Sequence, residues 1–445
     1  MQYGPRKGIQ IDAAGYRLQI TDQRNAFGYY SAMAKRETSV LSRRRFIQSA
    51  GFAGGGVLLA ACSGESGDPR YTADDRLRLQ QQREQEQAEA GRGPYGSQVY
   101  RGYRGLAELP WFSLADDGML VCHDEQVPRS IDVHAHLGIS VLMAPDVDLH
   151  AKPARVRHLL DCDDSEGGCT LDLDVYANGN FTEERLRALR WSTIAQGLWG
   201  SSFAETQTIP GLMDEMDAMR VEHAFILPIK TGMPFGDDLT ERWRRGISVA
   251  GAGRRLTAGQ SVHPHSDSSI AELREHAGNG ARLVKLHPTV QSFYPDDPAV
   301  MPLYEEAQQL GVVVFFHGGR AGIEPESRHR YALPRHYEAV LANFPNLQVI
   351  LGHAGARDGE AMLELALRYD NAWLGIHGQS VSRLEDIIRR TNGERLLFGT
   401  DWPFYHMGMS LAKVLLCTEQ PGRKDIRENI LRNNALTLFP ELGTA

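Results

Sequence analysis

The sequence predicts an α/β fold, a closed (β/α)8 TIM barrel with an insertion after its first strand. From about Ser130 onward, short apolar runs alternate with amphipathic stretches, as in a parallel sheet with crossover helices. Eight such units follow one another, which is the number that closes this barrel. Several runs are apolar at successive positions, which is typical of strands that are covered on both faces.

The eight predicted strands cover residues 131–136, 224–229, 256–262, 283–287, 312–317, 347–353, 372–377 and 396–401. The clearest helix follows the fourth strand, where Asp297 can cap it, Pro298 suits its first position and Gly311 can end it. Residues 138–211 are too long for a simple crossover. We therefore expect them to form the insertion, helical over 182–196, above the barrel mouth.

Composition excludes several classes of protein. The chain has 445 residues, 42% of them hydrophobic and 23% charged, the balance of a globular protein. Its 48 Lys and Arg against 56 Asp and Glu give a net charge of −8, which argues against a nucleic-acid partner. The sequence has no apolar run of ~20 residues, so a multi-span membrane protein is excluded. Five cysteines are too few for a disulfide scaffold.

The N-terminal residues look like an export signal rather than part of the fold. Residues 42–48, Ser-Arg-Arg-Arg-Phe-Ile-Gln, precede a short apolar, glycine-rich stretch that ends in Leu-Ala-Ala-Cys at 59–62. The arginines resemble a twin-arginine signal, and the last four residues resemble a bacterial lipobox in which Cys62 is acylated. A single membrane anchor is the alternative, but the stretch is short and interrupted by glycines.

These signals divide the chain into three predicted parts. Residues 1–61 are the leader and the twin-arginine and lipoprotein signal, with Met33 as an alternative start. Residues 62–107, rich in Gln, Glu and Arg, read as a flexible tether. Residues 108–445 are the barrel.

The same signals predict where the protein works. We expect an exported protein, periplasmic or at the cell surface, that meets the membrane only through a lipid on Cys62. A homo-oligomer is compatible with the sequence. In an oxidising compartment Cys162 and Cys169 can close a small disulfide loop, while Cys122 and Cys417 have no assigned partner.

Ionisable side chains lie at the ends of the predicted strands. In the first strand the alternation of a strand sends Asp132, His134 and His136 to one face. Two imidazoles there can bind one cation, with Asp132 orienting a ligand from behind, although a buried polar pair would look the same. His317, His353 and Asp401 end three later strands, and all strand ends of a barrel lie on one face. Their convergence predicts a metal site.

These motifs resemble the amidohydrolase superfamily. The matching segments are the His-x-His of the first strand, Val284-Lys285-Leu286-His287-Pro288, Phe316-His317, Gly352-His353-Ala354-Gly355 and Gly399-Thr400-Asp401-Trp402-Pro403. They are most similar to the branch of the carboxy-muconate-semialdehyde decarboxylases, resorcylate decarboxylases and pyrone-dicarboxylate lactonases. The ordered set is specific for the superfamily but not for one reaction.

The resemblance implies roles for individual residues. His134, His136, His317 and Asp401 would bind one divalent metal ion, zinc being expected and manganese or iron being able to replace it. Asp401 would also act as a general base, and His353 would move a proton or polarise the substrate.

Three residues near this set keep open alternatives. Some superfamily members bridge two ions with a carbamylated lysine, a role that Lys285 could take with His353 on the second ion. Lys285 could also be a charged wall residue. His287 is a candidate substrate-binding residue, or it caps the turn at Pro288. His377 ends the seventh strand, and the sequence does not decide whether it faces the pocket.

The loop after the fifth predicted strand is rich in arginine, and such loops build the substrate sites of barrels. Guanidinium groups pair with carboxylates, so Arg320, the arginine nearest to a metal ligand, is predicted to bind an anionic, small-molecule substrate. Exposed arginines are also common on any solvated surface.

The sequence therefore predicts a metal-dependent hydrolase that attacks an ester, lactone or amide with an activated water. A non-oxidative decarboxylase on the same scaffold is the first alternative. The second is a non-catalytic lipoprotein that binds metal or solute, which the intact ligand set together with His353 disfavours.

Overall fold

The fold is described from a computed structural model that covers residues 69–138, 147–161, 169–233 and 236–444. The predicted signal, Cys62 and Cys162 lie outside the described residues. Cys169 is disulfide-bonded, and Cys122 and Cys417 are buried free thiols. Within the described part of the chain, no helix is both long enough and apolar enough to span a membrane.

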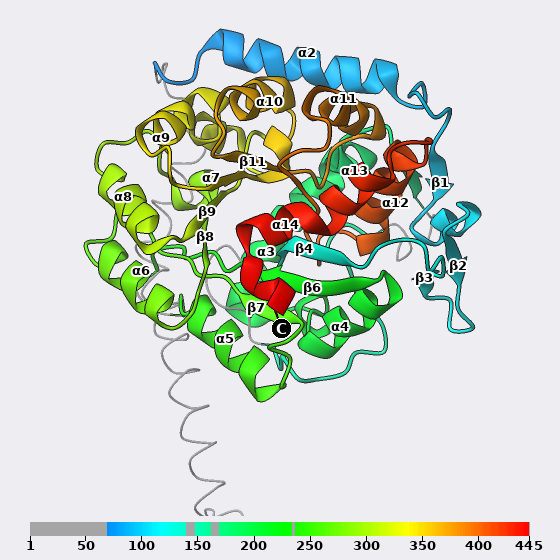
Figure 1. The fold of residues 1–445 in the computed structure, drawn as a ribbon, viewed down its shortest axis with the longest axis horizontal. Helices are drawn as coiled ribbons and strands as arrows, with labels where there is room; N and C mark the ends of the chain where they lie inside the picture. Colours follow the sequence, from blue (N-terminus) through cyan, green and yellow to red (C-terminus); the bar gives the residue numbers. More distant parts are fainter. Residues whose placement is uncertain (1–68, 139–146, 162–168, 234–235, 445) are drawn as a thin grey trace, which may run out of the picture. The chain divides into compact units, whose positions relative to one another are not determined.

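Eight parallel strands form the barrel, as predicted (Figure 1). They are β4 (Ser130–Ala135), β6 (Val221–Ile226), β7 (Leu256–Ala258), β8 (Leu283–Leu286), β9 (Val313–Phe316), β10 (Val349–Leu351), β11 (Ala372–Gly375) and β12 (Leu396–Leu397). One ladder joins β4, β6 and β7, and the other runs from β8 to β12. Bridges between Gln260 and Val284 and between Ala135 and Trp402 join the two ladders, which closes the ring.

Helices cover the outside of the ring (Figure 1). They are α4 (Ile209–Ala218), α5 (Leu239–Val249), α6 (Ser269–Gly278), α7 (Pro288–Gln291), α8 (Met301–Leu310), α9 (Glu338–Asn343), α10 (Gly359–Arg368), α11 (Val381–Thr391), α12 (Met407–Thr418) and α13 (Lys424–Glu428). Helix α8 ends at Gly311 with φ 65°, as predicted, but it begins at Met301. The Asp297 carboxylate accepts from Ala299 N, so it stabilises the turn before the helix rather than the helix itself.

Apolar side chains fill the barrel interior at the end away from the strand tips. Seven strands contribute to this cluster, among them Val133, Phe225, Phe315 and Trp373. Ala435 of α14 (Asn434–Leu438) and the adjacent Phe439 complete it from the C-terminal segment. Because both are 1% exposed, the C-terminal segment closes this end of the described barrel, and we look for a site at the opposite end.

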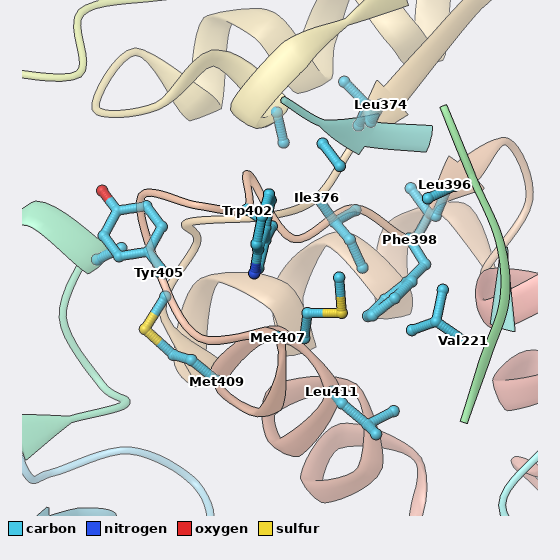
Figure 2. Packing of buried hydrophobic residues seen from close by; sticks show 14 of the residues in the cluster. Val221, Leu374, Ile376, Leu396, Phe398, Trp402, Tyr405, Met407, Met409 and Leu411 are labelled. Carbon is cyan, nitrogen blue, oxygen red and sulfur yellow. The ribbon is translucent and has the colours of Figure 1, made fainter. Parts of the chain in front are cut away.

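The insertion lies over the loop that follows β12. Backbone amides of Leu159 and Leu160 donate to the carbonyl oxygens of Pro403 and Phe404 at 2.9 Å each. Helix α3 (Glu183–Trp199) begins after Thr182, whose side chain accepts from Arg185 N, so the predicted helix in the insertion is confirmed. Trp402 of the same loop belongs to a buried cluster with Ile376, Phe398 and Met407 (Figure 2).

The prediction of a flexible tether over residues 62–107 is wrong for its described part. Helix α2 (Ala73–Glu89) lies against the barrel beside α10 and α11 (Figure 1). Strand β1 (Val99–Arg101) pairs with β5 (Thr170–Asp172) of the insertion, and β2 (Phe112–Leu114) pairs with β3 (Leu120–Cys122).

Ion pairs hold α2 in place. Asp75, 5% exposed, pairs with Arg335 at 2.8 Å. The Glu86 carboxylate pairs with Arg357 at 3.0 Å, and both side chains are less than 10% exposed. Leu79 adds a buried apolar contact. The polar composition of this segment is typical of a solvated tether. The partners of its carboxylates lie more than two hundred residues away, so the local sequence does not show that the segment is paired.

Candidate metal centre

Five barrel strands bring ionisable side chains to one end of the ring. Strand β4 carries His134 and leads into His136, β9 leads into His317, β10 into His353, β11 into His377 and β12 into Asp401. Each of these side chains is less than 10% exposed. The structure therefore brings these predicted side chains together at one end of the barrel.

Asp401 lies within reach of both histidines of the first strand. Its Oδ1 atom is 3.5 Å from Nε2 of His134 and 3.2 Å from Nε2 of His136. Ligands of one tetrahedral zinc ion are about 3.3–3.6 Å apart, because each lies about 2.0–2.2 Å from the metal. Both distances are thus close to those between ligands of a single ion, and the three residues, whose ligating atoms all lie within 4.8 Å of one another, form one of two such groups among the described residues.

The ring orientation of His136 leaves its ligating nitrogen free. Nδ1 lies 2.7 Å from the carbonyl oxygen of Leu227, which can only accept, so Nδ1 carries the proton. Nε2 then presents a lone pair toward Asp401. A backbone contact of this kind fixes the tautomer of a metal-binding histidine.

Asp132 supports the site through the backbone rather than through a histidine ring. Its carboxylate accepts from His134 N at 2.9 Å, from Thr400 N at 3.1 Å and from the Thr400 hydroxyl at 2.5 Å. The pairing of β4 with β6 shifts register between Asp132 and Ala135. This irregularity interrupts the alternation of side chains along the strand. The prediction that Asp132 and His134 lie on the same face is therefore wrong. Burial raises the pKa of Asp132 to about 7.

A second group of ligating atoms lies beside the first. Atoms of His134, His353 and His377 lie within 4.8 Å of one another. The His377 ring is 4.2 Å from that of His134 and 4.0 Å from that of His353, centre to centre. The sequence placed His377 at a strand end but could not decide its direction; the structure turns it into the cluster.

His317 joins the cluster through neighbouring rings. It stacks on His287 at 4.0 Å and lies edge-on to His353 at 4.5 Å. It belongs to neither group of ligating atoms. Its Nε2 atom is buried without a hydrogen-bond partner among the described residues, so a ligand at this nitrogen would satisfy it. The ligating atoms of His134, His136 and Asp401 are therefore grouped, whereas His317, the fourth predicted ligand, lies outside this group.

The structure places Lys285 inside the cluster and gives His287 a capping role. The amine of Lys285 lies 3.3 Å from Nε2 of His134 and 4.2 Å from the centre of the Phe315 ring. It is 1% exposed, and burial lowers its pKa to about 7. The His287 side chain accepts from Val290 N and thereby caps α7, the alternative that the sequence had left open.

Buried histidines in this cluster favour the neutral form, which is the form that binds metals. Burial lowers the pKa of His134, His353 and His377 well below the usual value, and neighbouring positive groups lower it further. Burial likewise lowers the pKa of His317 to about 3.

Glycines explain why the loops after β9 and β10 approach so closely. A Cβ on Gly319 would lie 1.8 Å from the carbonyl oxygen of Gly355, and one on Gly352 would lie 2.5 Å from that of Phe316. The two loops therefore touch backbone to backbone, which brings His317 and His353 together. His353 itself has φ 54°, a left-handed conformation that costs a non-glycine residue energy.

Gln379 holds the turn that carries His353. Its side-chain amide donates to the carbonyl oxygens of His353 at 2.5 Å and Ala356 at 3.0 Å. The amine of Lys413 in turn donates to the Gln379 carbonyl oxygen at 2.7 Å. Sequence reasoning missed both residues because neither lies in a recognisable motif.

The structure contradicts the prediction that Arg320 binds substrate. Its guanidinium donates to both carboxylate oxygens of Asp358, at 2.8 Å and 2.5 Å, and to the carbonyl oxygen of Asp75 at 2.6 Å. It is 2% exposed. Its position next to His317 in the sequence suggested the pocket, but the side chain supports the docked helix α2.

One protein family and several solved structures are similar to this chain. A family model described as Amidohydrolase matches residues 131–440. Similar solved structures include an uncharacterised TIM-barrel protein from Bordetella bronchiseptica, with 23% identity, a TM-score of 0.47, and coverage of 54% of this chain and 85% of that chain. Another is 2,6-dihydroxybenzoate decarboxylase from Rhizobium, with 19% identity, a TM-score of 0.43, and coverage of 54% and 93%. No functionally curated protein matches the chain.

Proposed function

This chain belongs to the amidohydrolase family of enzymes, and from that premise we propose that it is a metal-dependent hydrolase of a small ester, lactone or amide. The observation that carries the proposal is the triad of His134, His136 and Asp401. Its nitrogen and oxygen atoms have the spacing of ligands to one ion. Two imidazoles and a carboxylate suit zinc, although manganese and iron accept the same donors.

The residues fit such an ion in charge as well as in distance. Buried imidazoles in the neutral form offer lone pairs, and the single carboxylate offers negative charge. When bound, a divalent cation supplies positive charge that eases the deprotonation of a nearby water and polarises a substrate carbonyl.

Asp401 and His353 divide the proton transfers in the proposed reaction. Oδ1 of Asp401 faces His134 and His136, whereas Oδ2 lies on the side of His377. Oδ2 can therefore take a proton from the attacking water while Oδ1 stays among the ligands. His353, whose Nδ1 lies 3.4 Å from the Tyr176 hydroxyl, is the candidate that relays this proton from Asp401 to the leaving group, so that it is neutral before and after the step.

The described side chains beside His136 are apolar, and Arg320 is not available to a substrate. A small pocket next to this residue is lined by apolar side chains that include Leu227, Leu239 and Trp243. Arg320, the cation predicted to bind a substrate carboxylate, is already paired with Asp358.

A substrate panel in ¹⁸O-labelled water tests this function. We expect one ¹⁸O atom to enter the carboxylate product of an ester, lactone or amide. Asp401→Asn should abolish turnover, and asparagine keeps both the size and the left-handed backbone of Asp401, φ 59°. Release of carbon dioxide from a carboxylate panel, without ¹⁸O incorporation, would establish the decarboxylase instead. Absence of turnover with metal restored would leave only a binding protein.

We also propose that the enzyme works outside the cytoplasm, held by a lipid on Cys62. The support is the order of the twin-arginine and lipobox motifs. Labelling with a radioactive fatty acid, lost in Cys62→Ala, checks this proposal.

A further inference from the structure

We propose that Tyr176, a residue of the insertion, is a positioning residue for His353, whose imidazole it holds in the one orientation and tautomer that can relay a proton. The inference rests on the proposed function, in which His353 passes a proton from Asp401 to the leaving group. It starts from the distance of 3.4 Å between the Tyr176 hydroxyl and Nδ1 of His353, two buried side chains. Catalytic hydrogen bonds are commonly this long before a substrate is bound.

The insertion segment that carries Tyr176 is bonded to loops at the barrel mouth. The backbone amide of Ala177 donates to the carbonyl oxygen of Gly378, after β11, at 2.8 Å. The side-chain amide of Asn178 donates to the carbonyl oxygen of Ala321, after β9, at 2.9 Å. Strands β9 and β11 are the two neighbours of β10, which leads into His353. The insertion is therefore anchored on both sides of this histidine.

The Tyr176 ring occupies a place that a glycine keeps open. A Cβ at Gly378 would lie 2.9 Å from Cε2 of this ring, so any other residue there would displace the ring. The tyrosine also forms a small buried apolar cluster with Ala321 and Ala356. These contacts hold the phenol without help from His353, so its hydroxyl has a fixed position beside the imidazole.

The imidazole of His353 needs a contact of its own because its other polar support acts on the backbone. Gln379 donates to the carbonyl oxygen of His353 and so holds the turn, but not the ring, whose torsion is broad and roughly two-fold. A half-turn of the ring would put carbon atoms in the places of both nitrogens. With Nδ1 beside Tyr176, Nε2 is the nitrogen left for the relay.

The proton count of the relay fixes the tautomer of His353. Nε2 must offer a lone pair to the proton that Asp401 gives up, so the neutral ring carries its own proton on Nδ1. Nδ1 then donates to the Tyr176 oxygen. Nε2 releases the transferred proton to the leaving group, and the ring is neutral again, still with its proton on Nδ1. Burial raises the pKa of Tyr176 well above its usual value, so the phenol keeps its own proton throughout.

The dependence of turnover on the leaving group tests this role in Tyr176→Phe, which keeps the packed ring and removes only its oxygen. An alkoxide must be protonated as it leaves, whereas 4-nitrophenolate is a stable anion. In the zinc-loaded full-length protein, kcat for ethyl acetate should fall at least about tenfold, and kcat for 4-nitrophenyl acetate should change less than about twofold. KM should be unchanged for both esters. If acetate is a poor acyl group, the same two esters of an acid from the substrate panel replace it.

The tautomer of His353 gives a readout that needs no turnover. In ¹⁵N NMR of the zinc-loaded protein, with the signals of His353 assigned by their absence in His353→Gln, we expect a protonated Nδ1 in the parent. Tyr176→Phe should lose this preference. Tyr304→Phe is the matched control, because it removes a buried hydroxyl on α8, outside the ring of strands, that donates to the Pro295 carbonyl oxygen at 3.1 Å. It should match the parent in tautomer and on both esters.

The two readouts separate this inference from the proposed function. An equal fall in kcat for the two esters would overturn the inference, because a residue with a merely structural role affects both alike. An unchanged tautomer of His353 in Tyr176→Phe would overturn it as well. Failure of the parent to hydrolyse any member of the substrate panel would instead count against the proposed function, and the tautomer would still show whether Tyr176 orients His353.

Discussion

The Thr400 hydroxyl donates a hydrogen bond of 2.5 Å to the carboxylate of Asp132. Through this contact the first barrel strand is joined to the residue that precedes Asp401. The same carboxylate also accepts from the backbone of His134. Asp132 therefore sets the distance between His134 and Asp401, although it touches neither of their ligating atoms.

Thr400→Val should weaken metal binding. The variant removes a hydrogen bond to a fully buried carboxylate, and loss of a supporting contact of this kind lowers metal affinity about 10–100-fold. The zinc dissociation constant, measured by competition with a chromophoric chelator, checks this. Thr437→Val, which removes an exposed hydroxyl bonded to Asn433 O, should leave it unchanged. Equal affinity in the two variants would show that Asp132 does not position the site.

Gly319→Ala should destabilise the fold. The added Cβ would lie 1.8 Å from the Gly355 carbonyl oxygen, and φ at Gly319 is 71°. Forced separation of two packed backbones costs about 1–3 kcal/mol or more. Urea unfolding measures the loss. Gly253→Ala is the matched control because a Cβ there meets nothing within 4 Å. Similar losses in the two variants would contradict the backbone contact.

Arg357→Gln should release helix α2. The change leaves the buried Glu86 carboxylate without its partner, which typically costs about 3–5 kcal/mol. Backbone amides of α2 should then exchange hydrogen faster, while those of β9 and β10 stay protected. Arg76→Gln breaks a pair whose side chains are more than half exposed, so it should change exchange little. Unchanged protection of α2 in Arg357→Gln would argue that Leu79 and the Asp75–Arg335 pair hold the helix without Glu86.

The buried pair of His158 and Glu215 predicts a pH window of maximum stability. The two side chains meet at 3.0 Å, and Glu215 also accepts from the Trp402 indole. Burial by itself would raise the pKa of Glu215, but His406 and His158 outweigh it and lower the pKa to about 2. Burial would lower the pKa of His158, but Glu215 and Asp161 outweigh it and raise the pKa to about 9.

The signs of these shifts fix the window. Glu215 contributes fully above its ordinary pKa of 4.5, and its contribution is lost as pH falls toward 2. His158 contributes fully below 6.5, and its contribution is lost as pH rises through about 9. The pair therefore stabilises most between about pH 4.5 and 6.5.

His158→Gln tests this window by comparison with the parent. The difference in free energy of unfolding should be about 3–5 kcal/mol inside this window and should shrink as pH rises from 6.5 through about 9. Burial lowers the pKa of His223, so the parent loses stability at this residue as pH falls below 6.5. The free energy of unfolding of the parent minus that of His223→Gln should therefore rise with pH up to 6.5, which is the opposite trend to that of His158→Gln. A difference for His158→Gln that does not change with pH would mean that the pair is not charged.

The strands and the chemistry at their tips could be predicted because both are local. Eight apolar runs mark the strands, and five of them lead into a histidine or aspartate of the cluster, as in His317 and Asp401. The direction of His377 depends on neighbours from β4 and β10, so no local pattern contains it. The register shift after Asp132 likewise arises from pairing with β6.

The wrong predictions for Arg320 and for the flexible tether have the same physical cause. Arg320 and the segment of α2 carry charges, and exposed charges are the usual interpretation of such a sequence. Their partners are Asp358 and Asp75 in one case and Arg335 and Arg357 in the other. Pairing between distant segments lets charged side chains become buried, and composition alone does not reveal it.

Anomalous diffraction at the zinc absorption edge, from crystals grown with one equivalent of zinc, tests the central claim most directly. We predict a single strong peak about 2.0–2.2 Å from Nε2 of His134, Nε2 of His136 and Oδ1 of Asp401. A strong peak elsewhere, or no peak while these three side chains keep their positions, would contradict the metal centre on which the proposed enzyme depends.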